Sequence, residues 1–408
     1  MAGESVLAGV KVLDAASFIA GPAAAAVLAD FGAEVIKLEP PAGDLSRVLS
    51  SVPPCPRARA NYSWELTNRN KRSVAIDLKA PTATEVLSRL VGWADVVITN
   101  FPHGTREKLH LGYEEVSGWN PHVIYADVTG FGDAGPDAAL PGFDLTAYWA
   151  RSGLLASTRD AGAPPTVPIP GSGDYAAAMS LCAAIATALY HRERTGQGMS
   201  VGTSLLAAGV WSAGTFVAGA LAGGTSFGAH DPAAPTNPLI NPYQSADGRW
   251  LMLVVSPPHW PGLAAAVGYP SLPEDPRFAD AERIARNSAT LTELLDTAFR
   301  SQPLAHWREV LDRAHITYGV VQTPEEAAAD PQLRANGVVV PLDGDDDLTE
   351  TISSPITLRG RGKTPARRAP AIGEHNDDVL GELGFDRADI ARLRAAGVIP
   401  STARAEAA

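Results

Sequence analysis

The chain has 408 residues, with 33 Lys and Arg against 45 Asp and Glu, which gives a formal charge of −12. Hydrophobic residues make up 45% and charged residues 19%, a composition that excludes a chain disordered throughout. The net negative charge disfavours nucleic acid as a partner. The two cysteines, Cys55 and Cys182, exclude a disulfide framework and a cysteine-based metal cluster, and they favour a cytoplasmic location.

The first 130 residues alternate strand-like and helix-like segments. Apolar runs predict strands at 10–13, 34–38, 72–76, 96–98 and 123–128, and Ala-rich or amphipathic segments predict helices at 21–30 and 83–93. Strands that alternate with helices indicate a parallel sheet covered by helices. The turn after the first strand, residues 17–22, lacks the three glycines of a dinucleotide fingerprint, so NAD or FAD is not expected.

The rest of the chain predicts further elements around an uncharged stretch. Helices are expected at 176–192, 281–289, 291–300, 304–314, 377–383 and 387–396, strands at 250–255 and 319–321, a loop at 228–242 and a basic linker at 359–370. The 36 residues from Thr195 to His230 carry no Asp, Glu, Lys or Arg. Their length fits a membrane span, but their Gly, Ser, Thr and Ala content favours a helix buried on all sides, for example by another subunit. No membrane partner is therefore expected.

Asp174 stands in the segment Gly171–Tyr175 (GSGDY), directly before the predicted helix 176–192. One interpretation is structural, because Asp is a preferred helix N-cap. The other is catalytic: a helix N-terminus and glycine amides keep a carboxylate ionised, and such a carboxylate can act as a covalent nucleophile. The residues alone leave both interpretations open.

A basic cluster follows the predicted strand ends. It comprises Asn68–Ser73 (NRNKRS), Lys79, Arg106 and Lys108, with Asn100 and Phe101 between them. One interpretation is a solvated surface. The other is an anion site, since α/β sheets bind phosphates at strand ends and positive side chains pair with them.

Many short motifs occur in one order along the chain. They are Gly9–Asp14, Ala20–Pro22, Val35–Glu39, Gly43-Asp44 with Arg47, Asn70–Ser73, Ile76–Lys79, Asn100-Phe101, Gly142–Asp144, Gly173-Asp174, Tyr190–Gly198, Asp247-Gly248, Asp275–Phe278, Arg286-Asn287, Gly373–His375 and Leu383-Gly384. Together they resemble the family III CoA-transferases, which include formyl-CoA:oxalate and carnitine CoA-transferases and the α-methylacyl-CoA racemases. The resemblance runs from about residue 7 to residue 397.

The resemblance implies the architecture. A large Rossmann-like domain with a parallel sheet, residues 1–199 and 338–408, binds coenzyme A, and a smaller α+β domain, residues 228–337, closes over the acyl site. Residues 200–227 form a helical linker. Two chains interlock as a ring-like homodimer, and the uncharged stretch after Arg194 is then the part threaded through the partner.

The resemblance also implies the site. Asp174 corresponds to the catalytic aspartate, which forms an acyl-aspartyl anhydride and then an aspartyl-CoA thioester, and the glycines beside it supply donors for the oxyanion. The expected CoA contacts are Ala20, Leu78, Lys79, Asn100, Phe101, Lys108 and Phe143. Where some members carry an arginine for the CoA phosphates, this chain has Pro40-Pro41, and Arg47, Lys71, Arg72 or Arg106 is expected to compensate. Coenzyme A and acyl-CoA are substrates, with no permanently bound cofactor and no metal expected.

Three functions stay open on the sequence. The first is a CoA-transferase that moves CoA from an acyl-CoA to a carboxylic acid. The second is an acyl-CoA racemase, which is disfavoured because the racemases carry Gly-His-Asp where this chain has Gly142-Phe143-Asp144, and Phe cannot carry a proton. The third is a catalytically silent CoA-binding scaffold. Residues 235–242 replace the glycine run of the formyl-CoA:oxalate enzymes, so oxalate is not expected, and the donor and acceptor stay open.

Overall fold

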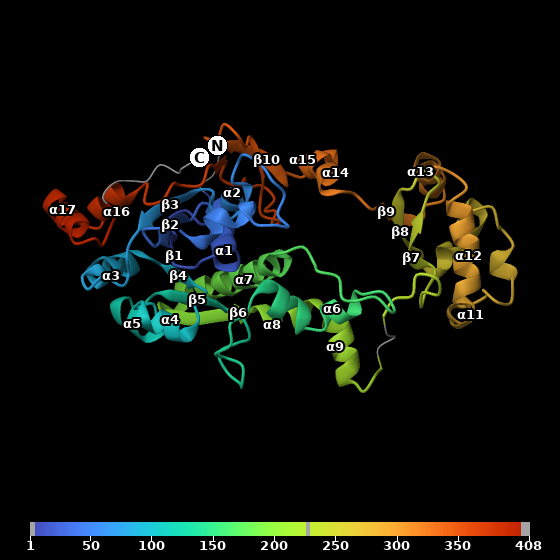
Figure 1. Ribbon diagram of the computed structural model, residues 1–408, viewed down its shortest axis with the longest axis horizontal. Helices are drawn as coiled ribbons and strands as arrows, with labels where there is room; N and C mark the ends of the chain where they lie inside the picture. The colour runs from blue at the N-terminus through green and yellow to red at the C-terminus, as the bar shows by residue number, and fades with distance from the viewer. Residues whose placement is uncertain (1–4, 226–228, 401–408) are drawn as a thin grey trace. The chain divides into compact units, whose positions relative to one another are not determined.

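Residues 5–225 and 229–400 are described in a computed structural model, and they form two compact units (Figure 1). Unit 1 comprises Met1–Leu154, Val167–Gly214 and Pro331–Ala408, and unit 2 comprises Leu155–Thr166 and Thr215–Asp330. Residues 155–166 thus group with unit 2, whereas their sequence predicts a place in the large domain. The bounds of the predicted domains stay a prediction. Residues 1–4, 226–228 and 401–408 of these domains lie outside the described residues.

Unit 1 is built on a six-stranded parallel sheet. Its strands are β1 (Lys11–Asp14), β2 (Glu34–Glu39), β3 (Lys71–Ala75), β4 (Val96–Thr99), β5 (Ile124–Thr129) and β6 (Met199–Ser204). They lie in the order β3-β2-β1-β4-β5-β6, and every neighbouring pair is parallel. This is the strand order of a Rossmann fold, which reverses between β1 and β4. The predicted α/β fold with a Rossmann-like parallel sheet is confirmed.

Helices cover both faces of this sheet. The helices of unit 1 include α1 (Ala20–Asp30), α2 (Tyr62–Asn68), α3 (Ala83–Trp93), α4 (His103–Lys108), α5 (Tyr113–Trp119), α7 (Ser172–Thr195), α8 (Leu205–Ser212), α15 (Pro331–Ala335), α16 (Asn376–Glu382) and α17 (Arg387–Ala395). One core joins α1 and α7 to a face that carries Val12 and Ile98. The other joins α3, α5, α16 and α17 to the opposite face, which carries Leu13 and Val97. Successive strand residues point to opposite faces, so continuous apolar runs serve both cores.

Helix α7 is long and apolar. Among the described residues, α7 is the one helix that is long and apolar enough, by length and composition, to cross a membrane. Its buried residues, among them Leu181 and Ile185, belong to the first core and pack with α1. A core helix passes the same test, and α7 is packed as one.

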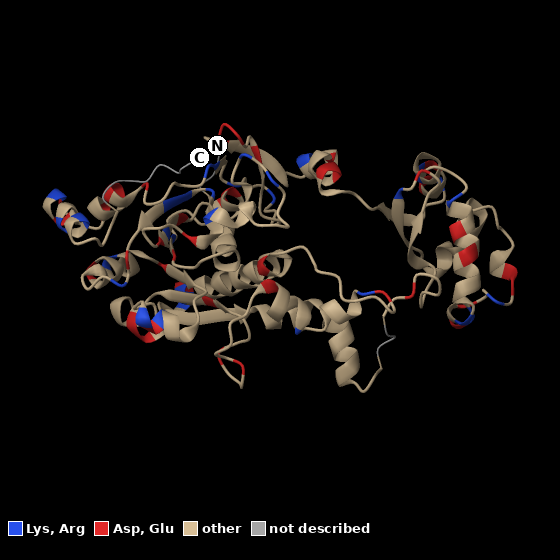
Figure 2. Cartoon of the chain, viewed as in Figure 1, with Lys and Arg blue, Asp and Glu red and all other residues tan. Residues whose placement is uncertain are grey.

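The uncharged stretch does not form a single helix. It contains the edge strand β6, then α8, then α9 (Gly214–Leu221), so the helical linker expected from residue 200 begins as a strand. Figure 2 shows no charged residue on α8 or α9. Trp211 on α8 is 87% exposed and Leu221 on α9 is 85% exposed. Their burial by a second chain stays a prediction.

A second, three-stranded sheet belongs to unit 1 and was not expected from the sequence. Its strands are β10 (Val339–Asp343), β11 (Glu350–Ile352) and β12 (Ala366–Arg367), in the order β11-β10-β12. β12 lies within the predicted linker 359–370. Such short strands carry too few residues to display an alternating pattern.

Unit 2 is an α+β fold. Its antiparallel sheet has the order β7-β8-β9, with β7 (Ile240–Gln244), β8 (Trp250–Val254) and β9 (Thr317–Val320). Its helices include α10 (Trp260–Ala266), α11 (Ala281–Arg286), α12 (Ser288–Phe299), α13 (Leu304–Arg313) and α14 (Pro324–Ala329), while the short α6 (Leu154–Ser157) and α9 lie at the boundaries of the units. Leu251 and Leu253 of β8 join Leu295 and Leu311 in its core.

Candidate active site

A cavity of about 750 Å³ lies at the carboxyl ends of β1, β4 and β5, within unit 1. Its lining includes Ser17–Ala20 after β1, Asn100–Pro102 after β4, Val128–Gly130 at the end of β5, Pro141–Thr146, Ile169–Gly171, Asp174 and Tyr175, and it continues over Leu45, Leu49, Pro54–Pro56, Tyr62, Ser63, Leu66 and Leu205. In open α/β sheets the ligand crevice lies where the strand order reverses, here between β1 and β4. The topology therefore favours this cavity as the ligand site.

The loop after β1 is held by hydrogen bonds at several backbone groups. Asn100 accepts from the Ser17 amide at 2.8 Å and donates to the Ser17 carbonyl at 2.6 Å. Asp44 accepts from the Ser17 hydroxyl at 3.0 Å and from the Phe18 amide at 3.3 Å. These bonds hold Phe18 at a φ of 62°, a left-handed conformation that a bulky side chain rarely adopts. The loop is thus a fixed wall of the cavity.

Buried charges lie beneath this loop. The Lys37 ammonium lies 2.9 Å from Asp44 and 3.9 Å from Asp14, and it also donates to the Ala16 carbonyl. Lys71 donates to Asp14 at 2.7 Å and to the Pro22 carbonyl at 2.8 Å. Burial raises the pKa of Asp44, but Lys37 and the hydrogen bonds from Ser46 outweigh it and lower that pKa to about 2. These paired charges position the loop and the start of α1.

Asp174 lies in the first turn of α7 and lines the cavity. The helix begins at Ser172, and the residue before it is Gly171 with a φ of 84°. The N-cap interpretation of Asp174 is therefore wrong, since Asp174 is the third residue of the helix. Gly171 suits the capping position because its left-handed backbone favours a residue without a side chain.

The neighbouring Asp144 takes the amides that the sequence assigned to Asp174. Asp144 accepts from the Gly171 amide at 2.6 Å and from the Gly173 amide at 2.9 Å. Burial and the charge of Asp144 raise the pKa of Asp174 to about 7. The expectation that glycine amides keep Asp174 fully ionised is wrong, because these two amides are bonded elsewhere and the carboxyl is poorly solvated.

Two aromatic side chains of the cavity lining contact each other. The rings of Phe18 and Phe143 meet edge to face, with their centres 6.0 Å apart. Phe143 is 59% exposed. The residue before it, Gly142, packs closely on Gly130, since a Cβ on Gly130 would lie 2.7 Å from the Cα of Gly142. Burial raises the pKa of Tyr175 to about 12, so this phenol stays neutral. The lining is mainly apolar.

Some of the predicted CoA contacts line the cavity together with Asp174. These are Ala20, Asn100, Phe101 and Phe143. Leu78 and Lys79 follow the end of β3 instead, where Leu78 packs on the second core and Lys79 is exposed. Lys108 is exposed at the end of α4. The role of each residue toward CoA stays a prediction.

The four candidates for the CoA phosphates are all paired with acids. Arg47 binds Glu39 through two bonds of 2.9 and 2.8 Å and lies over the Trp64 ring. Arg72 binds Glu382 at 2.7 Å and also Glu34. The buried Arg106 binds Asp127 at 2.9 Å, and the buried Lys71 binds Asp14 as described above. None of the four lines the cavity in the described residues, and their role toward CoA stays untested.

Sequence reasoning missed Asp144 and Asp44. Both occur in the quoted motifs, Gly142–Asp144 and Gly43-Asp44, but neither received a role. Asp144 bonds amides 27 and 29 residues away, and Asp44 bonds a loop 26 and 27 residues away. A sequence motif marks such residues without naming their partners.

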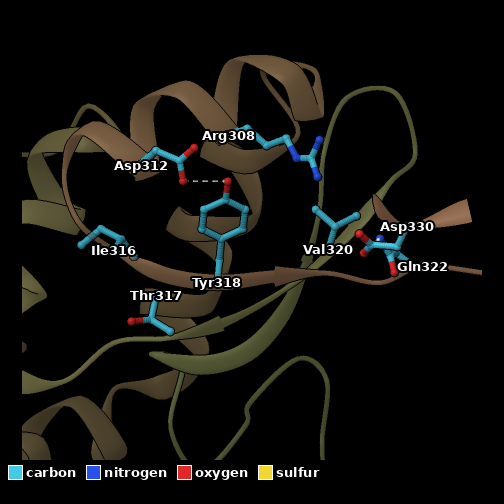
Figure 3. Close-up of a pocket in the computed structure, with 8 residues that line it drawn as sticks. All are labelled: Arg308, Asp312, Ile316, Thr317, Tyr318, Val320, Gln322 and Asp330. Atoms are coloured by element: carbon cyan, nitrogen blue, oxygen red, sulfur yellow. Dashed lines mark hydrogen bonds between the residues drawn. The ribbon is translucent and has the colours of Figure 1, made fainter. Parts of the chain in front are cut away.

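A second cavity, of about 480 Å³, lies within unit 2 (Figure 3). Arg308, Asp312 and Tyr318 line it, and the Tyr318 hydroxyl donates to Asp312 at 3.0 Å. It contains none of the residues that the sequence analysis singled out. The cavity around Asp174 is therefore the better candidate for the active site.

Comparisons with known proteins agree with this fold. The sequence profile of CoA-transferase family III matches residues 7–376. The chain is 31% identical over 401 residues to (R)-2-hydroxy-4-methylpentanoate CoA-transferase of Clostridioides difficile. The aligned residues cover 97% of this chain and 99% of the relative. It is 33% identical over 390 residues to succinyl-CoA:mesaconate CoA-transferase of Haloarcula marismortui, with 92% and 96% covered. A crystal structure of a CaiB/BaiF family protein from Brucella suis has 28% identity and a TM-score of 0.82, with 93% of this chain and 100% of that chain covered.

The profile spans most of the chain, and both relatives exceed 30% identity over nearly their whole length. Both relatives are named CoA-transferases, so the racemase alternative is not favoured. The chain belongs to CoA-transferase family III and is a CoA-transferase.

Proposed function

We propose that the protein moves CoA from an acyl-CoA thioester to a carboxylic acid through covalent intermediates on Asp174. The observation that carries this proposal is the position of Asp174, a partly buried carboxyl that lines a mainly apolar cavity at the switch point of the sheet. Burial and the charge of Asp144 raise the pKa of Asp174 to about 7. A poorly solvated carboxylate is a stronger nucleophile than one in water, and at neutral pH a large share of Asp174 is ionised.

The reaction takes four balanced steps. The Asp174 carboxylate attacks the thioester carbonyl, the C–S bond breaks, and an acyl-aspartyl anhydride and CoA thiolate result. The thiolate then attacks the aspartyl carbonyl, releases the first acid as its carboxylate and leaves an aspartyl-CoA thioester. The acceptor carboxylate attacks this thioester, the C–S bond breaks, and a second anhydride, between the acceptor acid and Asp174, forms as the thiolate leaves. The thiolate finally attacks the new acyl carbonyl, which yields the product acyl-CoA and restores Asp174.

The groups around Asp174 suit these reaction steps. The Gly171 and Gly173 amides hold Asp144 and thereby fix the turn that carries the nucleophile. We assign Ala20, Asn100, Phe101 and Phe143, which share the cavity with Asp174, to the pantetheine arm and thioester. Leu78, Lys79 and Lys108, on exposed or partly exposed surface after strand ends, are assigned to the nucleotide. A phosphate contact from Arg47, Lys71, Arg72 or Arg106 requires that residue to give up or share its carboxylate partner.

The proposal extends to assembly and location. An interlocked homodimer is supported by the apolar surfaces of α8 and α9, each of which exposes a large side chain. A cytoplasmic location is supported by Cys55 and Cys182, which are both free thiols. Light scattering at several protein concentrations tests the dimer, and a monomer at all of them refutes it.

The covalent intermediate is tested directly with a panel of acyl-CoA donors and acids. Incubation with a donor, followed by hydroxylamine and mass spectrometry, is expected to place a hydroxamate on the peptide that contains Asp174. The matched variant Asp174→Asn keeps the side-chain size but cannot attack the thioester. It is expected to lose transfer and label together. Full transfer by Asp174→Asn refutes the assignment, and α-hydrogen exchange without any acceptor acid supports a racemase instead.

A further inference from the structure

We propose that the groups transferred by this enzyme are uncharged and apolar, so that acyl-CoA donors and acids with a second carboxylate are poor substrates. This inference rests on the proposed function, because it assumes that the acyl group lies in the cavity beside Asp174. It names the substrate class that the function leaves open.

The first observation is the charge of the cavity. Within the described residues, its lining contains no Lys, Arg or His, and its only Asp and Glu residues are Asp144 and Asp174. A second carboxylate on the substrate therefore finds no cation in this cavity. It also enters the field of two acidic residues, one of which already raises the pKa of the other.

The second observation is the use of the polar groups in the lining. Asn100 bonds both backbone groups of Ser17, and the Ser17 hydroxyl bonds Asp44. The Tyr62 hydroxyl donates to the Pro56 carbonyl at 2.8 Å. The Tyr175 phenol is neutral, with a pKa raised to about 12, and neutral donors such as Tyr175, Ser63 and Thr129 compensate a desolvated carboxylate less well than a cation does.

The third observation is the place of two basic side chains, Arg57 and Arg59, of which Arg59 forms an ion pair with Asp347 at 3.6 Å. Arg57 and Arg59 line a separate cavity of about 1330 Å³, and the only lining residue that it shares with the cavity of Asp174 is Leu45. Leu45 is 65% exposed. The arginines thus stand outside the lining that receives the acyl group.

The physical consequence is discrimination by charge. A carboxylate moved from water into an apolar cavity loses its hydration and regains it only through a cation or several donors. A branched alkyl group of the same size gains from the same burial. Rings from Phe18, Phe101 and Phe143 add flat apolar surface, so aromatic acyl groups fit the same chemistry.

The test compares two donors of equal size. Succinyl-CoA and 4-methylpentanoyl-CoA differ only in a carboxylate against an isopropyl group at the end of the same two-carbon spacer. Each is paired with acetate as the acceptor, kcat/KM is measured, and the aspartyl label is quantified for each donor. We expect kcat/KM for 4-methylpentanoyl-CoA to exceed that for succinyl-CoA at least tenfold. Phenylacetyl-CoA forms a third arm and is also expected to exceed succinyl-CoA.

A substitution at the rim sharpens the test. Leu45→Arg places a cation at the edge of the cavity, and it is expected to narrow the preference for 4-methylpentanoyl-CoA at least threefold. Leu45→Met changes the shape without charge and is expected to keep the wild-type ratio. Equal or better turnover of succinyl-CoA by the wild type overturns this inference alone, since the label on Asp174 still forms. An absence of both transfer and label with all three donors overturns the proposed function and this inference with it.

Discussion

The Asp144–Asp174 pair predicts the pH dependence of the first half-reaction. The pKa of Asp174 is raised to about 7, first by burial and second by the charge of Asp144. The proposed nucleophile is the deprotonated carboxylate, so the rate of adduct formation rises with pH and levels off above about 7. Asp144→Asn removes the charge but keeps the side-chain size. It is expected to lower the pKa of Asp174 and move the rising limb to lower pH.

The magnitude follows from the ionised fraction. With a pKa of about 7, Asp174 is roughly one-tenth ionised at pH 6 and nine-tenths ionised at pH 8, so adduct formation rises about tenfold over this range. In Asp144→Asn the rise over the same range is smaller, because more of Asp174 is already ionised at pH 6. Burial, the larger cause, is unchanged, so the limb stays above the 3.8 of a solvated Asp. The lost acceptor for one glycine amide costs about 1–3 kcal/mol of stability.

The assay is single-turnover labelling of Asp174 by a donor, quenched with hydroxylamine and read by mass spectrometry at six pH values between 5 and 9. Glu193→Gln is the matched control, because Glu193 is exposed on the same helix, about 28 Å along its axis from Asp174. Its profile is expected to coincide with that of the wild type. The assigned electrostatics are refuted if the rise of the labelling rate with pH does not shift in Asp144→Asn, or if that rise lies near pH 4 in the wild type.

Three further predictions concern stability. The folded pKa of Asp174 lies above its unfolded value of 3.8, so the folded state loses stability as pH rises from about 4 to about 7. Asp174→Asn is expected to be more stable than the wild type by up to about 4 kcal/mol at pH 8 and by less than about 1 kcal/mol at pH 4, and equal melting at pH 8 contradicts this. Gly173→Ala is expected to lose about 1–3 kcal/mol of unfolding free energy and most activity, because its Cβ would lie 2.2 Å from Tyr148 and 2.3 Å from Asp144. The control Gly92→Ala, whose Cβ would have no atom within 4 Å, is expected to gain up to about 1 kcal/mol in thermal melts. Lys37→Met leaves Asp44 buried without its cation and is expected to lower the unfolding free energy by about 3–5 kcal/mol. The exposed control Arg334→Met is expected to lower it by about 1 kcal/mol or less, and equal shifts in melting temperature for the two variants contradict the buried network.

Elements with a local signal were predicted well. The helix at 83–93 matches α3 residue for residue, and the predicted helix at 21–30 differs from α1 by one residue. Both carry their pattern within a few turns, so nothing distant is needed to read them. Strand β7 was missed because Pro242 marks a loop. A strand at the edge of a sheet tolerates proline, since one side makes no ladder bonds, and β7 is such a strand.

The sequence indicates that Asp174 lies near a helix start, but it does not indicate which groups the neighbouring amides bond. The GSGDY motif places Asp174 beside a helix start, and in the structure Asp174 lines the mainly apolar cavity of about 750 Å³. Its glycine amides, however, bond Asp144, which is distant in sequence. The basic cluster shows the same limit. Lys71 and Arg106 have the composition of an anion site, yet each is buried against an acid that only the fold brings near.

The hydrogen bonds of Asp144 bear on the nucleophilic role that we propose for Asp174. Had the Gly171 and Gly173 amides bonded Asp174, they would have stabilised its charge, lowered its pKa and occupied its lone pairs. They bond Asp144 instead, whose charge then opposes ionisation of its neighbour. The carboxylate of Asp174 is thus more basic than one in water, and a more basic carboxylate is the stronger nucleophile toward a thioester. The same burial that destabilises the folded protein at neutral pH therefore supports the proposed attack, and an enzyme with a fully stabilised Asp174 is expected to be more stable and slower.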